Sequence, residues 1–329
     1  MSDVKVGFVG TGGMANAHIS QVETIEEATI IAFCDIEEER AKVAADRYGG
    51  QYYTDARRLI DETEVDAIYF CLPPFAHTDI ERLAAESGRH IFVEKPVSMT
   101  VDHGLSVLEA VNKNSVVSSV GYQGRYQNAE IALRDYFKDK AIGMVISHRW
   151  GGIAGGADHW WRVMEKSGGM LHEQATHQVD MIRYLAGEIT EVYKLSAMKI
   201  NTDQPNQTIP DAEIVSLKFA SGAVGQITTT CALTGGGGSM RTDFILEDHQ
   251  IVQLGWGNFE IQPENFDTIE ISTDPQLGID QAFIQAIQTN NQSLIKSSYA
   301  DGLQSALVSI CANQSAEEGK PVAVPQVVS

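Results

Sequence analysis

The chain has 329 residues, of which 43% are hydrophobic and 21% charged, and this length and composition predict a globular protein of about two domains. Its formal net charge of −20 excludes a surface built to bind nucleic acid or an anionic membrane, because such a surface must be basic. No apolar run approaches the roughly 20 residues of a membrane span, so we expect neither a nucleic acid nor a membrane as partner.

The first part of the chain, residues 1–123, alternates short apolar runs with helix-length amphipathic stretches. Nearly all-apolar strands that alternate with helices indicate a parallel sheet covered on both faces. We take this segment as the first domain. Strands are predicted at 4–10, 29–35, 65–74, 90–96 and 115–123, and helices at 13–24, 36–49, 75–88 and 101–114.

The second part, residues 124–329, is richer in alternating apolar and polar residues. A period near 2 favours a mostly antiparallel sheet with one face packed. An open sheet normally needs a partner surface, so we expect a homodimer or homotetramer through this sheet. β-rich segments are predicted at 212–232, with a turn at 220–222, and at 240–262, and helices at 126–139, 173–186, 279–290 and 300–318.

Four cysteines lie far apart and form no Cys-x-x-Cys pair: Cys34, Cys71, Cys231 and Cys311. We interpret them as reduced core residues, which favours a cytoplasmic protein.

A glycine-rich turn follows the first predicted strand and opens the first helix, with the pattern Gly10-x-Gly12-x-x-Ala15. Gly10 permits a tight turn, Gly12 lets a pyrophosphate approach the backbone, and Ala15 allows close packing of the helix. The helix start then offers free N–H groups to the phosphates. The alternative is a glycine-rich turn without a ligand.

Asp35 favours the dinucleotide interpretation, because an acid at the end of the second strand can accept hydrogen bonds from both ribose hydroxyls. The same carboxylate repels a 2′-phosphate, and no Arg or Lys follows it at once. We therefore predict NAD(H) as cofactor in preference to NADP(H).

A second candidate site lies in the predicted helix at 173–186. Glu173 and His177 are spaced i, i+4 and so would share one helix face, and Asp180 follows three residues later. Histidine is a proton carrier near neutral pH, and a carboxylate beside it stabilises its charged form. The alternative is a surface Glu–His pair. We expect no metal, since this is not an HExxH motif.

The glycine turn, "PPFAH" (73–77), "EKP" (94–96) and "GGMLHEQATHQVD" (168–180) follow one another in this order along the chain. Together they resemble the glucose–fructose oxidoreductase/inositol dehydrogenase/rhizopine catabolism (Gfo/Idh/MocA) family over essentially the whole chain. The resemblance implies an N-terminal Rossmann domain, a C-terminal α+β domain with a large open sheet, and NAD(P)-dependent oxidation or reduction of a sugar-like hydroxyl.

The resemblance also implies roles for individual residues. Lys95 matches the family's catalytic lysine, and its bond to Pro96 is expected to be cis. His177 matches the general base. Glu173 stands where the family commonly has aspartate, so it can bind substrate, orient His177 or do neither. Ala175 likewise replaces a common glycine, and both departures put the substrate subclass in doubt.

Other polar and aromatic residues are candidates for the two ligands. Glu94 either contacts the cofactor or is a solvated strand end, and His77 either faces the cofactor or caps a helix. Arg125 either binds substrate or is structural. Trp160 and Trp161 either stack on a sugar or pack between domains. His18, His90, His103 and His249 show no supporting constellation. The cofactor set is Gly10, Thr11, Gly12, Gly13, Met14, Asp35, Pro73, His77, Glu94 and Lys95, and the substrate set is Lys95, Gln123, Arg125, His159, Trp160, Trp161, Arg162, Glu173 and His177.

We therefore predict an NAD-dependent dehydrogenase of a sugar, sugar derivative or cyclitol, with Lys95, His177 and Glu173 as catalytic residues. The first alternative is an NAD-dependent glycosidase that acts by transient oxidation and elimination. The others are a reductase of a non-sugar carbonyl or imine and a non-catalytic nucleotide sensor. The sensor is disfavoured because it would need only the glycine turn.

Overall fold

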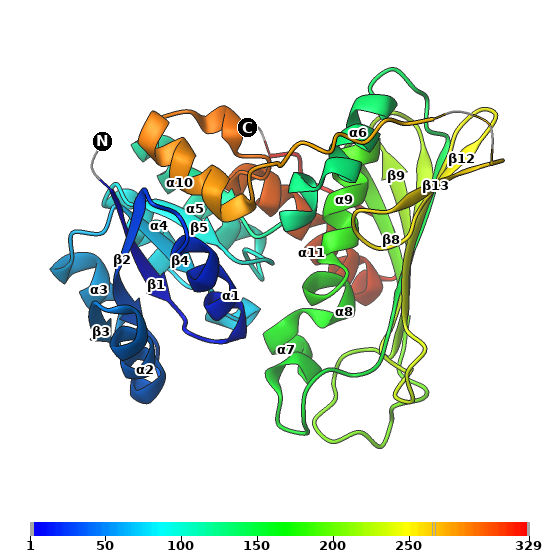
Figure 1. Ribbon diagram of the computed structural model, residues 1–329. Helices are drawn as coiled ribbons and strands as arrows, with labels where there is room; N and C mark the ends of the chain where they lie inside the picture. The colour runs from blue at the N-terminus through cyan, green and yellow to red at the C-terminus, as the bar shows by residue number, and fades with distance from the viewer. Residues whose placement is uncertain (1–2, 265, 267, 328–329) are drawn as a thin grey trace. The chain divides into compact units, whose positions relative to one another are not determined.

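The computed structural model describes residues 3–327 apart from 265 and 267, and it divides into two compact units (Figure 1). Unit 1 comprises Met1–Gly121 and Leu277–Leu303, and unit 2 comprises Tyr122–Gln276 and Gln304–Ser329. The boundary expected after residue 123 lies close to the observed one. Residues 277–303, which we expected in the second domain, belong to unit 1.

Unit 1 is built on a six-stranded parallel sheet with the strand order β3-β2-β1-β4-β5-β6. This is the order of the doubly wound Rossmann fold, and the predicted parallel sheet is confirmed. The central strands are buried on both faces, which explains their apolar sequences. The strands are β1 (Val4–Val9), β2 (Ala28–Cys34), β3 (Gln51–Tyr53), β4 (Ala67–Phe70), β5 (His90–Val93) and β6 (Ser118–Val120).

Helices connect these strands, and one further helix arrives from far along the chain. Helix α10 (Ile279–Thr289) packs beside α1 (Gly13–Val22), as Figure 1 shows. Its Phe283 ring meets the rings of Tyr69 and Phe92 edge-on, at centroid distances of 5.5 and 5.7 Å. The others are α2 (Glu38–Tyr48), α3 (Ala56–Glu62), α4 (Ile80–Glu86), α5 (Val101–Asn114) and the short 3₁₀ helices η1 (Pro74–Ala76) and η4 (Gln292–Leu294).

Two local features of unit 1 differ from the sequence-based expectation. The helix expected at 75–88 is interrupted, because the backbone leaves helical geometry at His77, with φ −68° and ψ 112°, before α4 begins. Strand β3 and helix α3 were not predicted, since three and seven residues are too few to show a clear period.

Unit 2 contains an eight-stranded sheet with the order β13-β12-β11-β7-β10-β9-β8-β14. Strands β7 and β10 are parallel and the other pairs are antiparallel, which confirms the predicted mostly antiparallel sheet. The strands are β7 (Met144–Trp150), β8 (Ile189–Ala197), β9 (Ala212–Phe219), β10 (Val224–Thr230), β11 (Ser239–Ile245), β12 (Gln250–Gln253), β13 (Phe259–Gln262) and β14 (Val322–Ala323).

In the described part of unit 2, helices cover one face of this sheet only (Figure 1). Strand β9 shows the consequence, because its residues alternate between buried and exposed positions. The helices are η2 (Gln123–Tyr126), α6 (Asn128–Phe137), η3 (Trp160–Arg162), α7 (Met164–Ser167), α8 (Gly169–Glu173), α9 (Thr176–Ala186) and α11 (Tyr299–Glu318), of which residues 304–318 belong to this unit.

A buried ion pair on the covered face anchors the short helix α8. Glu213 on β9 pairs with Lys194 on β8, and both side chains are 1% exposed. The Oε2 atom of Glu213 also accepts hydrogen bonds from the backbone N–H of Leu171, at 3.0 Å, and from Thr229 Oγ1, at 2.7 Å. The sheet therefore fixes the position of the segment that leads to Glu173.

Over the residues that the structure describes, we find no helix both long and apolar enough to cross a membrane. All four cysteines are free thiols, and Cys34, Cys231 and Cys311 are buried, as expected for core residues.

Candidate functional site

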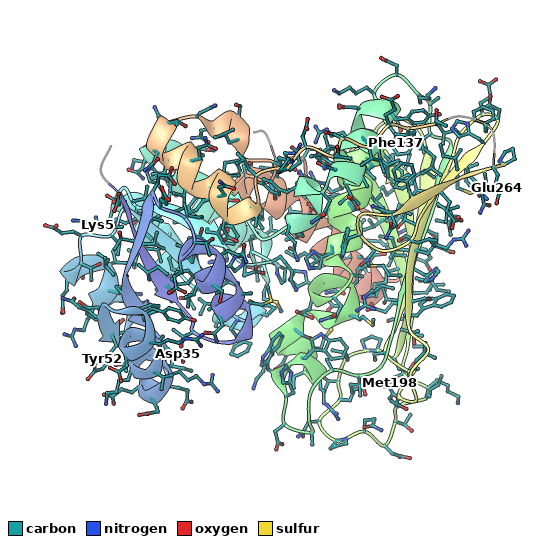
Figure 2. All side chains as sticks on the ribbon, viewed as in Figure 1. Lys5, Asp35, Tyr52, Phe137, Met198 and Glu264 are labelled. Atoms are coloured by element: carbon teal, nitrogen blue, oxygen red, sulfur yellow. The ribbon has the colours of Figure 1, made fainter. Side chains whose placement is uncertain are left out.

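Unit 1 gathers its candidate residues along one edge of its sheet. Gly10 follows β1, Asp35 follows β2 and Glu94 follows β5. Because the strands are parallel, these residues lie at the carboxyl edge, where open α/β sheets bind ligands. Figure 2 shows Asp35 at the end of β2.

The turn between β1 and α1 leaves room for a ligand against the backbone. Gly10 has a φ of 86°, and a Cβ atom there would lie 2.3 Å from the carbonyl oxygen of Cys71, so the turn requires glycine. At Gly12 or Gly13, by contrast, an added Cβ would meet nothing in the described part of the chain within 4 Å. The open space before α1, next to the exposed Met14, fits a pyrophosphate held by backbone N–H groups.

Asp35 fixes the shape of this turn. Its Oδ2 atom accepts hydrogen bonds from the backbone N–H and the hydroxyl of Thr11, both at 2.9 Å. Its Oδ1 atom accepts the backbone N–H of Glu37, also at 2.9 Å. A carboxylate has about four acceptor positions, so about one remains for a ribose hydroxyl.

The end of β5 carries Glu94 and Lys95 in a defined geometry. The Lys95–Pro96 peptide bond is cis, as the resemblance implied. Glu94 is only 3% exposed, so the alternative of a solvated strand end is wrong. Its Oε2 atom accepts the backbone N–H of Lys95 at 3.1 Å, and Lys95 itself is half-buried.

His18 has a constellation that our sequence analysis missed. Its Nε2 lies 2.8 Å from Glu94 Oε1, and its Nδ1 lies 2.7 Å from Asp280 Oδ1. Burial alone would lower the pKa of His18, but the hydrogen bonds to Asp280 and Glu94 outweigh it and raise this pKa from 6.5 to about 10.

A sequence signal for His18 did exist. It falls on the inward stripe of α1 with Ala15, Ile19 and Val22, at helical spacing, and a polar residue on such a stripe needs partners. Its two partners are far away in the sequence, however, and nothing local identifies them.

The segment after β4 provides the remaining candidates of unit 1. Pro73 caps η1. The His77 side chain is buried, with its Nδ1 atom 2.6 Å from Glu81 Oε1. His77 is the C-cap of η1, the short helix at the two prolines, and its backbone N–H donates to the carbonyl of Pro74, which agrees with the capping alternative. Contact of His77 with the cofactor stays a prediction.

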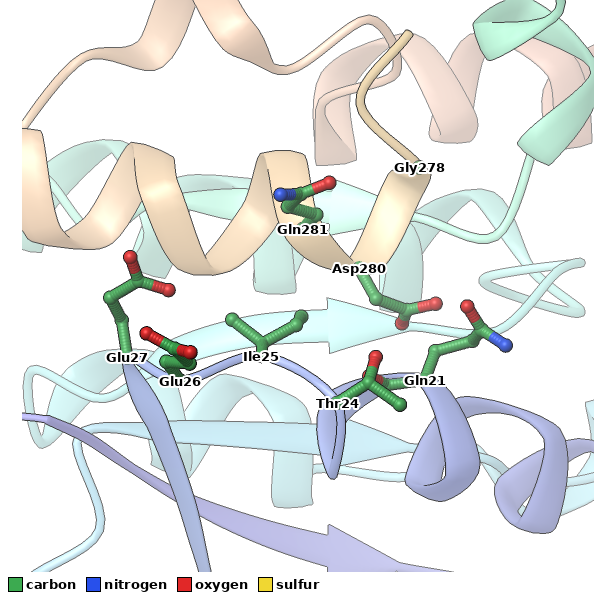
Figure 3. Close-up of a pocket in the computed structure, with 8 residues that line it drawn as sticks. All are labelled: Gln21, Thr24, Ile25, Glu26, Glu27, Gly278, Asp280 and Gln281. Carbon is green, nitrogen blue, oxygen red and sulfur yellow. The ribbon is translucent and has the colours of Figure 1, made fainter. Parts of the chain in front are cut away.

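A surface cavity of unit 1 lies at the other end of α1 from the glycine turn (Figure 3). It is lined by Glu26, Glu27 and Asp280, among other polar residues. Ten residues of helix separate its position from the turn by about 15 Å. Because carboxylates repel phosphate, we do not assign the dinucleotide to this cavity.

In unit 2, the helix expected at 173–186 is broken into α8 and α9. The backbone N–H groups of Gln174 and Ala175 both donate to the carbonyl of Met170, so the i→i−4 pattern stops there. Glu173 ends α8 and His177 lies in the first turn of α9. The expectation that these two residues share the face of one continuous helix is therefore wrong.

Glu173 is tied to the interior of unit 2. Its Oε2 atom accepts a hydrogen bond from the indole Nε1 of Trp161 at 2.6 Å, and another from the side-chain amide of Gln174. Trp161 is 2% exposed and packs with Met170 and Ile209. Trp161 is therefore a core residue of unit 2 that holds Glu173, and its packing lies within this unit.

Aromatic rings frame His177. The ring centroids of Tyr122 and Trp256 each lie 5.8 Å from that of His177, both in edge-to-face arrangement. The Tyr122 hydroxyl lies 2.7 Å from Thr176 Oγ1, and burial raises the pKa of this phenol well above its usual range. Our sequence analysis named neither aromatic residue as a site candidate, because both fall in segments that it predicted as β structure, at 115–123 and 240–262.

Asp180 points to a different partner. Its carboxylate forms a two-point ion pair with Arg125, at 2.7 and 2.8 Å, and both side chains are 2% exposed. The Ser305 hydroxyl also donates to Asp180. This arrangement corresponds to the structural alternative for Arg125. The neighbouring Gln123, in contrast, is exposed at the start of η2.

The remaining candidates surround η3. Arg162 is 6% exposed and donates to the carbonyl of Gly155 at 3.0 Å, which makes it a link within the loop. His159 caps η3 through the backbone N–H of Trp161 and lies against the half-buried ring of Trp160. Of this group, His159 and Trp160 retain exposed surface for a ligand.

Comparison with known proteins identifies the two domains of the chain. Residues 4–122 match an oxidoreductase family with an NAD-binding Rossmann fold, and residues 131–251 match the Gfo/Idh/MocA C-terminal domain. Levoglucosan dehydrogenase of Pseudarthrobacter phenanthrenivorans is 25% identical over 99% of this chain and 100% of its own length. Myo-inositol 2-dehydrogenase of Thermotoga maritima is 24% identical over the same shares of the two chains.

A solved structure shares the fold. The WlbA dehydrogenase from Chromobacterium violaceum, in complex with NADH and UDP-GlcNAcA, has a TM-score of 0.86 at 24% identity, over 99% of this chain and 97% of that chain. The fold and the matched domains define an NAD-binding oxidoreductase. The chain belongs to the Gfo/Idh/MocA family.

The glycine turn yields a matched pair of variants. Gly10→Ala is expected to destabilise the protein by about 1–3 kcal/mol, because alanine is strained at this φ and collides with Cys71. Gly12→Ala should cost less than about 1 kcal/mol of stability but weaken NADH binding at least roughly 10-fold. Thermal unfolding and NADH fluorescence titration measure the two effects. Wild-type NADH affinity in Gly12→Ala would contradict the proposed cradle.

The His18 cluster predicts a pH dependence of stability. The native state holds a proton that the unfolded chain releases above about pH 6.5, so this stabilisation is complete below pH 6.5 and disappears as pH rises toward 10. The free energy of unfolding should therefore fall over this range, by up to a few kcal/mol. Chemical denaturation at several pH values, with His18→Gln as control, tests this. Equal slopes in the two proteins would contradict the raised pKa.

Proposed function

We propose that this protein is an NAD(H)-dependent dehydrogenase that acts on a secondary hydroxyl, or the corresponding ketone, of a sugar, sugar derivative or cyclitol. The observation that carries the proposal is the alignment of the glycine cradle, Asp35 and Lys95 along the carboxyl edge of one parallel sheet. The substrate class comes from relatives named levoglucosan dehydrogenase and myo-inositol 2-dehydrogenase.

The chain's own residues would hold the cofactor and move the substrate proton. Backbone N–H groups from Gly12 onward bind the pyrophosphate, and Asp35 binds the ribose. When bound, the nicotinamide supplies a hydride acceptor for the substrate C–H. His177 takes the hydroxyl proton, while the Lys95 ammonium stabilises the negative charge that develops on the same oxygen. Glu173, held by Trp161, binds a neighbouring substrate hydroxyl.

The surroundings of His177 support its role as base. The rings of Tyr122 and Trp256, each in edge-to-face arrangement with the imidazole, restrict the positions open to it, which keeps it pre-oriented. Aromatic faces also suit the C–H surfaces of a sugar ring. Exposed polar groups at Gln123 and His159 supply partners for its hydroxyls.

We also propose that NAD(H) is preferred to NADP(H), because the Asp35 carboxylate repels a 2′-phosphate. Arg40 is the first basic residue after Asp35, and exposed Ile36 and acidic residues stand between them. With four free thiols and no membrane-spanning helix in the described residues, we place the protein in the cytoplasm.

The uncovered face of the unit 2 sheet supports a homo-oligomer. Leu195 on β8 and Ile214 on β9 lie opposite each other in register, and they are 56% and 45% exposed. Such neighbouring apolar side chains favour burial against a second copy of the chain. We propose a dimer or tetramer through this face.

The activity is tested with a panel of sugars, cyclitols and their keto forms, monitored by NADH absorbance. We expect turnover with NAD⁺ and a clearly lower kcat/KM with NADP⁺. Lys95→Met and His177→Ala should each lower kcat/KM by about 10²–10⁴-fold, and His177→Ala should do so without loss of NADH binding. Wild-type kcat/KM in either variant would refute the assigned roles, and turnover without net NADH would favour the glycosidase.

Assembly is tested by light scattering during gel filtration. The wild type should elute with two or four times the chain mass of 35.9 kDa. Ile214→Asp should lower the mass, because a charge on the apolar face opposes its burial. Val43→Asp, at an exposed apolar position on α2, is the matched control and should leave the mass unchanged. A monomeric wild type would rule out the assembly.

A further inference from the structure

His18 joins three separate segments of unit 1 through one ring. It extends from α1, Glu94 follows β5, and Asp280 lies in the first turn of α10. Figure 3 shows the Asp280 carboxylate directed toward α1. A carboxylate only accepts hydrogen bonds, so a ring bonded to one carboxylate at each nitrogen donates from both and is an imidazolium.

The Glu94 carboxylate is held from three directions. His18 Nε2 binds its Oε1 atom at 2.8 Å, and the backbone N–H of Lys95 binds its Oε2 atom at 3.1 Å. On the third side lies Gly121, where an added Cβ would come within 2.5 Å of Oε1. The carboxylate therefore has one orientation, and that orientation is linked directly to the backbone of Lys95.

Besides Glu94 and Asp280, the described neighbours of His18 include two aromatic rings and one thiol. The ring packs on Phe92 and Tyr69, at centroid distances of 4.7 and 5.7 Å. The nearby Cys71 thiol is neutral near pH 7, because burial and then the charges of Glu94 and Asp280 raise its pKa. These three ionised groups carry a net charge of −1 in the interior, and apolar residues of equal volume would often be more stable.

We propose that His18 is a positioning residue that holds Glu94 against the Lys95 backbone and so sets the direction in which the Lys95 ammonium projects. This inference rests on the proposed dehydrogenase function. The reaction then depends on a residue of the first helix that itself touches neither the substrate nor the cofactor.

Two substitutions separate the two hydrogen bonds of His18. The amide nitrogen of Gln occupies the place of Nε2, so His18→Gln keeps a donor to Glu94 and loses the one to Asp280. The amide nitrogen of Asn occupies the place of Nδ1, so His18→Asn keeps the donor to Asp280 and loses the one to Glu94. Both variants remove the same charge, and each is therefore the control for the other.

We expect His18→Asn to lower kcat at least roughly 10-fold more than His18→Gln, because only Asn releases Glu94. The Kd for NADH and the melting temperature should be similar in the two variants, because both lose the same charge. A merely structural role of His18 would instead lower kcat equally in the two variants. Equal losses of kcat, or a larger loss in His18→Gln, would overturn the proposal. The pH profile of kcat is recorded for both variants, and in the less active one its shape should change as Lys95 moves.

If His18→Asn does not fold, a double-mutant cycle between His18→Leu, which removes the donor to Glu94, and Glu94→Gln tests the same link. Non-additive losses of kcat are expected, and additive losses would overturn the inference. Failure of the proposed function can be told apart from failure of the role proposed for His18. A wild-type protein inactive on the whole panel refutes the dehydrogenase, and the role of His18 with it, whereas an active wild type with equal variants refutes only His18.

Discussion

Parallel pairing of strands is the constraint on which unit 1 depends. Each parallel strand needs a crossover, and each crossover returns the chain to the same starting edge, so every strand ends at the opposite edge. The turn after β1, Asp35 after β2 and Lys95 after β5 are separated in sequence but share that edge. The hydrogen bonds between Asp35 and Thr11 then fix two of these strand ends to each other. The chemistry assigned to unit 1 follows from this alignment.

The features predicted correctly from sequence are those with a local cause. The strand, glycine turn and helix at 4–24 show their periods and their breaker residues within one short segment. The alternation in β9 and β10 likewise reports directly which side chains face the packed side. The family resemblance added the cis bond before Pro96 and the order of the motifs.

The features missed from sequence depend on distant partners or on a few backbone bonds. The role of His18 depends on its hydrogen bonds to Glu94 and Asp280, and no local sequence pattern links these two residues to α1. The break before α9 arises from two N–H groups that share one carbonyl oxygen, and the helical period of 173–186 continues across it. Asp180, at helical spacing from His177, is instead paired with Arg125.

Glu173 shows how a departure from the family pattern is accommodated. The extra methylene brings its carboxylate to the indole N–H of Trp161, which belongs to the core of unit 2. Glu213 and Lys194 support the same region from the sheet by fixing the start of α8. The longer acid is therefore held by a specific donor within unit 2.

Helix α10 has a consequence for how the protein is made. The ribosome completes β1 to β6 before it reaches residue 277, yet the partner of His18 and the Phe283 ring come from beyond that point. Until then the nascent sheet lacks the Phe283 ring that packs against Tyr69 and Phe92. Folding of the first unit can therefore be completed only after α10 has been synthesised, which prolongs the exposure of these apolar rings during translation.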